Sequence, residues 1–221
     1  MGLKRTENQD SLSNKTFKDH HIFVVCDGVS GLPNGKKASQ VAAESILTAF
    51  TPERHELPYS LQKAMDTSQA TVMETYPKPM GTTIAAICLF QKTAYIAWCG
   101  DSRIYYFSDG SLKWMSRDHN VLHDILNKGE RSAGMFLNPQ ALNRFFGREY
   151  RVEPEYYTIP LKKHDQLLLC TDGLSNFLME PEIIQAMTKN KPQEASDLME
   201  RKLLSKKVGA PDNFTWYIIQ I

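Results

Sequence analysis

Residues 81–115 read GTTIAAICLFQKTAYIAWCGDSRIYYFSDGSLKWM, and they predict three or four β-strands separated by short breaks. The apolar residues come in runs of strand length, and Asp109-Gly110 is a strong hairpin signal between the last two runs. Strands joined by such short connections pair antiparallel, because a parallel pair needs a crossover of roughly a dozen residues or more. We therefore expect this block to form an antiparallel meander.

Blocks of strands and pairs of helices make up the rest of the chain. Residues 21–26 read as a strand, and residues 36–50 and 60–76 have the apolar spacing of two helices. Residues 119–129 predict a further short helix. Later strands are expected in VEPEYYTIPL, DQLLLCT and DNFTWYIIQI, and later helices in EPEIIQAMTK and PQEASDLMERKLLSK. Because the helices come in pairs instead of alternating with every strand, segregated α+β layers fit better than a doubly wound parallel sheet.

Composition and charge are those of an ordinary globular protein. The chain has 221 residues, of which 42% are hydrophobic and 23% charged, and it shows no obvious linker, so we expect one domain. The formal net charge of +1 gives no global attraction to nucleic acid or to an anionic membrane. No apolar run approaches the roughly 18 residues of a membrane span. The first ten residues are polar, unlike a secretory signal, and we expect a cytoplasmic protein.

Three hydrophobic segments lead to an aspartate. FVVC, YIAWCG and LLLCT precede Asp27, Asp101 and Asp172, and a fourth aspartate, Asp212, lies just before the last strand in GAPDN. Any one Asp-Gly pair could be a simple turn, as Asp109-Gly110 is expected to be. Carboxylates that adjacent strands bring together repel one another unless divalent cations intervene. Hard oxygen ligands favour Mg²⁺ or Mn²⁺ over zinc.

The start of the chain adds a guanidinium to this set. The sequence RTENQD places Arg5, Asn8 and Asp10 in one polar loop. Arginine binds phosphate oxygens through two parallel hydrogen bonds, which a lysine ammonium does not reproduce. Metal ions together with an arginine indicate a phosphoryl substrate.

Seven motifs, in order, carry a resemblance to a known family. They are RTENQDS, CDGVSG, GTT (81–83), GDSRIY (100–105), RDH (117–119), TDGLSN (171–176) and PDN (211–213). This set resembles the metal-dependent type 2C serine/threonine protein phosphatases and looks like a short bacterial-type member. The resemblance spans essentially the whole chain and implies a single catalytic domain over residues 1–221. It also implies a four-layer αββα sandwich, with two antiparallel sheets face to face and helices outside, and a flap beside the active site at about residues 130–150.

The resemblance also implies a metal site. Asp27 would bridge two Mn²⁺ or Mg²⁺ ions, and the Gly28 carbonyl would bind one of them. Asp172 and Asp212 would complete the shell of one ion, and Asp10 would hold metal-bound water at the other. A water shared by two cations loses much of its proton affinity and becomes a nucleophile near neutral pH.

Arg5 would bind the substrate phosphate in this scheme.

Two positions depart from the family pattern. Val29 stands where many members, especially animal ones, have a histidine thought to protonate the leaving group. Asn176 stands where relatives usually have an aspartate linked to a third metal, so Asp101 alone would bind a third ion weakly.

The function that the resemblance implies is hydrolysis of phosphoserine and phosphothreonine in proteins, opposing a bacterial serine/threonine kinase. Phosphorylated proteins would be the partners, including such a kinase or its substrates. A catalytically inactive module that binds phosphoproteins is the alternative from another class of function. A phosphatase dedicated to one anti-sigma-factor antagonist would share the chemistry and differ only in its partner.

Two other motifs are weak signals of other sites. GLPNGKKA (31–38) lacks the spacing and hydroxyl of a P-loop. His119 and His123 have zinc-helix spacing without the glutamate of H-E-x-x-H, so a structural role is favoured.

Overall fold

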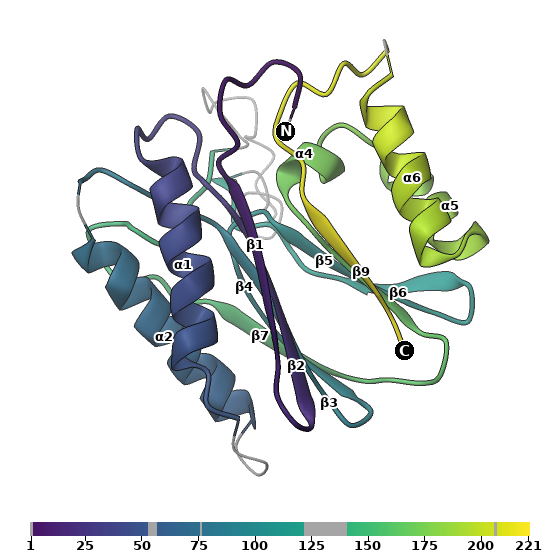
Figure 1. Ribbon diagram of the computed structural model, residues 1–221, viewed down its shortest axis with the longest axis horizontal. Coiled ribbons are helices and arrows are strands. Elements are labelled where there is room, and N and C mark those ends of the chain that lie inside the picture. Colours follow the sequence, from purple (N-terminus) through teal and green to yellow (C-terminus); the bar gives the residue numbers. More distant parts are fainter. Residues whose placement is uncertain (1, 53–56, 76, 122–140, 206) are drawn as a thin grey trace.

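A computed structural model of the chain describes residues 2–52, 57–75, 77–121, 141–205 and 207–221. Two antiparallel β-sheets pack face to face, and a pair of helices covers the outer face of each sheet (Figure 1). The predicted α+β class and the four-layer αββα sandwich are confirmed.

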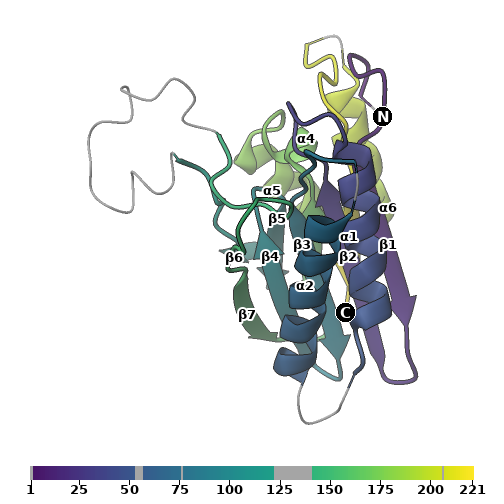
Figure 2. The same cartoon turned by 90° about the vertical axis from the view of Figure 1, so that its left-hand side faces the viewer.

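The first sheet has five strands in the order β1-β2-β3-β4-β7, and they span Asp10–Thr16, His20–Asp27, Ile84–Phe90, Thr93–Cys99 and Glu155–Pro160. Its outer face is covered by α1 (Gly35–Ala49) and α2 (Leu57–Glu74), which lie in front of the sheet in Figure 2.

The second sheet has the order β6-β5-β8-β9, and these strands span Ser111–Met115, Arg103–Ser108, Gln166–Cys170 and Trp216–Gln220. The helices α5 (Glu180–Lys189) and α6 (Pro192–Leu203) cover it, and a short helix α4 (Asp172–Ser175) follows β8.

The central strands are buried on both faces, which explains their continuous apolar runs. Side chains alternate along a strand. Val25 of β2 therefore belongs to the core between the two sheets, and its neighbours Val24 and Cys26 to the core under α1 and α2. In β8, Leu169 lies between the sheets and Leu168 packs in the core with residues of α5 and α6. Each sheet thus packs against the other sheet on one face and against helices on the other, and this packing positions the ends of its strands.

The predicted meander over residues 81–115 is wrong at its centre. β3 and β4 form one hairpin and β5 and β6 another, but β4 lies in the first sheet and β5 in the second. The chain changes sheets at Gly100, whose φ of +111° is in the left-handed region that favours glycine. The Asp109-Gly110 turn is confirmed as the β5–β6 connection, with positive φ at both residues.

Two further differences concern β1 and the segment after β6. β1 was not predicted, because its sequence DSLSNKT is mostly polar; it is an edge strand, paired with β2 and half exposed. The helix predicted over 119–129 does not include its first two residues. His119 is outside any helix, and Asn120 forms an isolated bridge with Leu142. The rest of that helix, and residues 130–140 of the predicted flap, lie outside the described residues.

No helix in the described part of the chain is long and apolar enough to cross a membrane.

Candidate active site

The aspartates that follow the hydrophobic segments meet at one end of the sandwich. Asp27 ends β2, Asp172 begins α4 directly after β8, and Asp101 lies in the connection between β4 and β5. Asp212 precedes β9, the neighbour of β8. The change of sheet at Gly100 is what brings Asp101 to this end.

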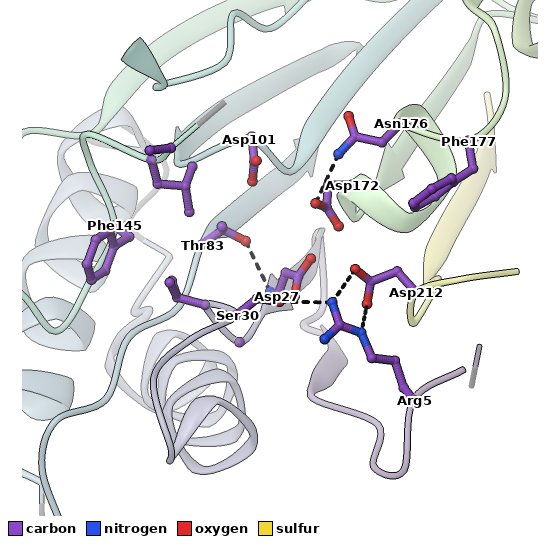
Figure 3. Close-up of a pocket in the computed structure, with 14 residues that line it drawn as sticks. Arg5, Asp27, Ser30, Thr83, Asp101, Phe145, Asp172, Asn176, Phe177 and Asp212 are labelled. Atoms are coloured by element: carbon purple, nitrogen blue, oxygen red, sulfur yellow. Dashed lines mark hydrogen bonds and ion pairs between the residues drawn. The ribbon is translucent and has the colours of Figure 1, made fainter. Parts of the chain in front are cut away.

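A cavity of about 500 Å³ lies between these loops. Six predicted site residues line it: Arg5, Asp27, Gly28, Asp101, Asp172 and Asp212. Figure 3 shows the side chains of Arg5 and the four aspartates around a common centre. The structure therefore brings together residues that are up to 207 positions apart in the sequence. Asp10, the seventh predicted residue, does not line the cavity.

Asp10 lies behind the cavity, at the start of β1 and directly opposite Asp27 in the strand register. One carboxylate oxygen, Oδ2, accepts a hydrogen bond of 2.9 Å from the Thr171 hydroxyl. The other oxygen, Oδ1, is buried and has no hydrogen-bond partner within the described ranges. Burial raises the pKa of Asp10 to about 6. A buried acceptor without a donor is costly, and a water or an ion at this position would satisfy it.

Burial and mutual repulsion raise the pKa values of the other carboxyl groups. The pKa of Asp27 lies well above its usual value, first because of burial and then because of the charges on Asp172 and Asp10. Burial and the charge of Asp172 raise the pKa of Asp101 to about 8, and burial raises the pKa of Asp172. Cations between these groups would oppose both causes. The all-oxygen donor set, the unpaired Asp10 oxygen and the raised pKa values together fit hard divalent cations.

These pKa values predict how the stability of the metal-free protein changes with pH. A carboxyl group with a raised pKa in the folded state stabilises the fold below its unfolded pKa, and this stability is lost as pH rises through the folded value. Asp101, with a pKa of about 8, should lower the free energy of unfolding by at most about 1.4 kcal/mol per pH unit between pH 6.5 and 8. Burial lowers the pKa of His119, and a lowered histidine pKa makes stability rise with pH. This rise is largely complete above the usual histidine pKa of about 6.5, so it does not cancel the fall in stability caused by Asp101.

Urea unfolding in the presence of a chelator would measure this dependence. We expect stability to fall from pH 6.5 to pH 8 without metal, and Mn²⁺ to restore it at pH 8. Stability that rises over this range in the chelated protein would contradict the assignment of these shifts.

Arg5 lines the cavity, where it is paired with a carboxylate. Its Nε and Nη2 donate to the two carboxylate oxygens of Asp212, at 2.7 and 2.6 Å, and Nη2 also donates to the Ser30 hydroxyl at 3.1 Å. Asn176 donates similarly to Oδ2 of Asp172, at 3.1 Å. Among the described residues, no group of three or more His, Cys, Asp or Glu side chains is arranged to hold a metal ion. We attribute the lack of such a group to carboxylates that already accept hydrogen bonds from protein donors. When a cation binds, Asp212 must either keep its hydrogen bonds to Arg5 and bind the cation as well, or give up those hydrogen bonds.

Two threonines that had no assigned role hold Asp27 in place. The backbone N–H of Asp27 donates to the Thr83 hydroxyl at 3.1 Å, and the Thr82 hydroxyl donates to the Asp27 carbonyl at 2.9 Å. Thr83 in turn lies 2.6 Å from the hydroxyl of Ser102, the neighbour of Asp101. The loops that carry Asp27 and Asp101 are thus joined by buried hydroxyl groups. The motif GTT was visible in the sequence, but nothing in it indicates which strand ends the hydroxyls would join.

Two glycines allow the loops to approach closely. A Cβ on Gly28 would lie 2.4 Å from the carbonyl carbon of Gly35, at the start of α1. A Cβ on Gly173 would lie 1.7 Å from the carbonyl oxygen of Asn213. The second contact sets Asp172 beside Asp212, since each aspartate immediately precedes a residue of the touching pair.

His119 is held by protein groups at both of its ring nitrogens. Its Nδ1 accepts a hydrogen bond of 3.1 Å from the backbone N–H of Gly100, and its Nε2 lies 3.1 Å from Oε1 of Glu155. Because both ring nitrogens face protein groups, His119 supports the connection that carries Asp101. His123, its partner in the zinc-helix alternative, lies outside the described residues.

Comparisons with known proteins agree with this geometry. A family model described as "Protein phosphatase 2C" matches residues 4–204, which is most of the chain. The chain belongs to the protein phosphatase 2C family. The serine/threonine phosphatase stp of Listeria monocytogenes serotype 4b is 30% identical over 234 residues, which cover 99% of this chain and 92% of that protein.

Solved structures of other protein phosphatase 2C relatives have the same fold. The serine/threonine phosphatase PstP/Ppp of Mycobacterium tuberculosis has a TM-score of 0.84 at 26% identity, covering 100% of this chain and 94% of the other. The catalytic domain of PstP in complex with two manganese ions has a TM-score of 0.80 at 25% identity, over 98% and 92% of the two chains.

Proposed function

We propose that this protein phosphatase 2C member is a metal-dependent enzyme that hydrolyses phosphoserine and phosphothreonine in proteins. The observation that carries the proposal is the convergence of four aspartates and one arginine on a single cavity (Figure 3). An inactive phosphoprotein-binding module would have no need of so many mutually repelling carboxylates. The names of the Listeria relatives as serine/threonine phosphatases support the same reaction.

In the mechanism we propose, Asp27, Asp172, Asp212 and the Gly28 carbonyl would hold two Mn²⁺ or Mg²⁺ ions. When bound, these ions supply an activated water nucleophile and neutralise charge on the phosphoryl oxygens. The protein's own groups would place the reactants: the buried Oδ1 of Asp10, which has no hydrogen-bond partner among the described residues, would accept a hydrogen bond from a water behind the cavity.

Arg5 is the phosphate-binding group in this mechanism. Its side chain is 39% exposed, and its guanidinium already makes two parallel hydrogen bonds to Asp212, a geometry that a phosphate matches. When the substrate enters, donors of Arg5 turn to the phosphoryl oxygens, where they offset the charge that is redistributed in the transition state.

Several finer points are part of the proposal. We propose one catalytic domain over residues 1–221, with residues 130–150 as a flap beside the site. We also propose a weak third ion on Asp101, a cytoplasmic location, and a bacterial serine/threonine kinase whose action the enzyme reverses. The inventory of oxygen ligands supports the choice of Mn²⁺ or Mg²⁺ over softer metals.

Turnover of a phosphothreonine peptide tests the proposal. We expect purified protein to release inorganic phosphate with Mn²⁺ present, to stop when a chelator is added, and to resume with excess Mn²⁺. Tight binding of the phosphopeptide without phosphate release would instead support the inactive module.

A further inference from the structure

The cavity has a charged floor and an apolar rim. The floor carries the aspartates and Arg5. Four further lining residues are apolar and are called the apolar rim here: Ala141, Leu142, Phe145 and Phe177. The rest of the lining is Gly28, Val29 and the neutral polar residues Ser30, Thr83 and Asn176. Phe145 and Phe177 lie on opposite sides of the carboxylates in Figure 3. The four apolar side chains have no acid, base or metal-binding atoms, so they contribute no group to the phosphoryl chemistry.

The cavity is larger than a phosphoryl group requires. Its volume of about 500 Å³ lies within the roughly 300–1,000 Å³ of pockets that enclose drug-sized ligands. A phosphoryl group has only a few heavy atoms and binds at the charged floor. Room therefore remains for the residues that flank the phosphorylated side chain.

Phe145 is a fixed part of the apolar rim. Its ring packs against bare backbone, because a Cβ on Gly81 would lie 2.7 Å from two of the ring carbons. The guanidinium carbon of Arg148 lies 5.0 Å from the ring centroid. The next residue, Phe146, is buried, and its backbone exchanges two hydrogen bonds of 2.9 Å with Thr82. Because the ring is held before substrate binds, contact with it costs little conformational entropy.

Phe177 is fixed on the other side by the helix that begins at Asp172. The backbone N–H of Asn176 donates to the Asp172 carbonyl at 2.8 Å, and that of Phe177 donates to the Leu174 carbonyl at 3.3 Å. The Phe177 side chain packs against the core under α5 and α6 while remaining partly exposed at the cavity. A second apolar surface is thus tied directly to a residue of the charged floor.

We infer that the site prefers phosphorylated residues with apolar neighbours on both sides, which contact Phe145 and Phe177. The inference rests on the proposed phosphatase function and names its substrate class. Apolar neighbours would remove the exposed faces of the two rings from water, which is favourable in proportion to the area covered. Polar neighbours placed against the two rings would lose hydrogen bonds to water, because the ring faces offer no donor or acceptor in exchange.

Two phosphothreonine peptides that differ only at the flanking positions test this preference. One has leucine on both sides of the phosphothreonine and the other has serine on both sides. For the wild-type protein with Mn²⁺ we expect kcat/KM to be roughly tenfold higher for the leucine peptide. Phe145→Ala should reduce this ratio to about two- or threefold, whereas Phe145→Leu, which keeps an apolar side chain, should preserve most of it.

Tyr59→Ala is the matched control, because Tyr59 is an aromatic residue on α2 that is 59% exposed and does not line the cavity. It should leave the ratio at the wild-type value. A wild-type ratio near one, with both peptides turned over, would overturn the inference while leaving the phosphatase function intact. An unchanged ratio in a folded Phe145→Ala protein would also overturn it. Failure to hydrolyse either peptide or para-nitrophenyl phosphate would overturn the proposed function itself.

Discussion

Asp27→Asn should lower kcat/KM for a phosphothreonine peptide by roughly a thousandfold or more. Asp27 is the proposed shared ligand of both cations, and an amide offers one neutral oxygen where the carboxylate offers two charged ones. The loss should appear in kcat, because charge stabilisation in the transition state is removed. Steady-state kinetics at saturating Mn²⁺ would measure it.

The variant should nevertheless remain folded. Burial and neighbouring charges raise the pKa of Asp27 well above its usual value, so at neutral pH the metal-free fold loses stability either by binding a proton there or by burying the charge. A neutral amide removes this cost. We expect thermal unfolding of chelated Asp27→Asn at pH 8 to occur at or above the wild-type temperature. Asp109→Asn is the matched control: it replaces an exposed aspartate in the β5–β6 turn, at a positive φ that asparagine tolerates. Full activity in Asp27→Asn would contradict its proposed role.

Arg5→Ala should lower kcat/KM by roughly a hundredfold, because a charge-assisted, bidentate contact to the phosphate is lost. Arg5→Lys should recover little of this activity, since an ammonium does not reproduce the two parallel hydrogen bonds. Lys4→Ala, which removes the neighbouring exposed cation, controls for a general loss of positive charge.

The same variant separates phosphate binding from metal binding. Arg5 now donates to both oxygens of Asp212, at 2.7 and 2.6 Å, so its removal frees that carboxylate for a cation. We therefore expect Arg5→Ala to bind Mn²⁺ at least as tightly as the wild type, as measured by calorimetry. A parallel loss of activity and Mn²⁺ binding would show instead that Arg5 supports the metal site, and would contradict its role as a phosphate ligand.

The sequence predicts the layers of this fold well, because burial on both faces of a strand leaves a continuous apolar run, as in β3 and β8. It predicts the partition of strands between the sheets poorly. The β4–β5 connection is as short as a hairpin, and only the left-handed Gly100 redirects the chain into the second sheet. β1 lacks an apolar pattern because most of its side chains are exposed or half-buried, so its pairing opposite Asp27 was not predictable from periodicity.

The candidate site was predictable as a set of residues but not as a geometry. Each aspartate stands at the end of a hydrophobic segment, so the segments themselves mark Asp27, Asp101 and Asp172. No local pattern indicates that Arg5 pairs with Asp212, because that contact joins the two ends of the chain and depends on the order of β8 and β9. The role of Thr83 was missed for the same reason: its hydroxyl joins two loops from different strands.

Titration of metal-free protein with Mn²⁺ in a calorimeter tests the central claim most directly. We predict that each chain takes up two Mn²⁺ ions at up to millimolar concentration, and that Asp27→Asn loses this uptake while Asp109→Asn keeps it. Well-folded wild-type protein that takes up no Mn²⁺ or Mg²⁺, or an Asp27→Asn variant that binds two ions as the wild type does, would contradict it.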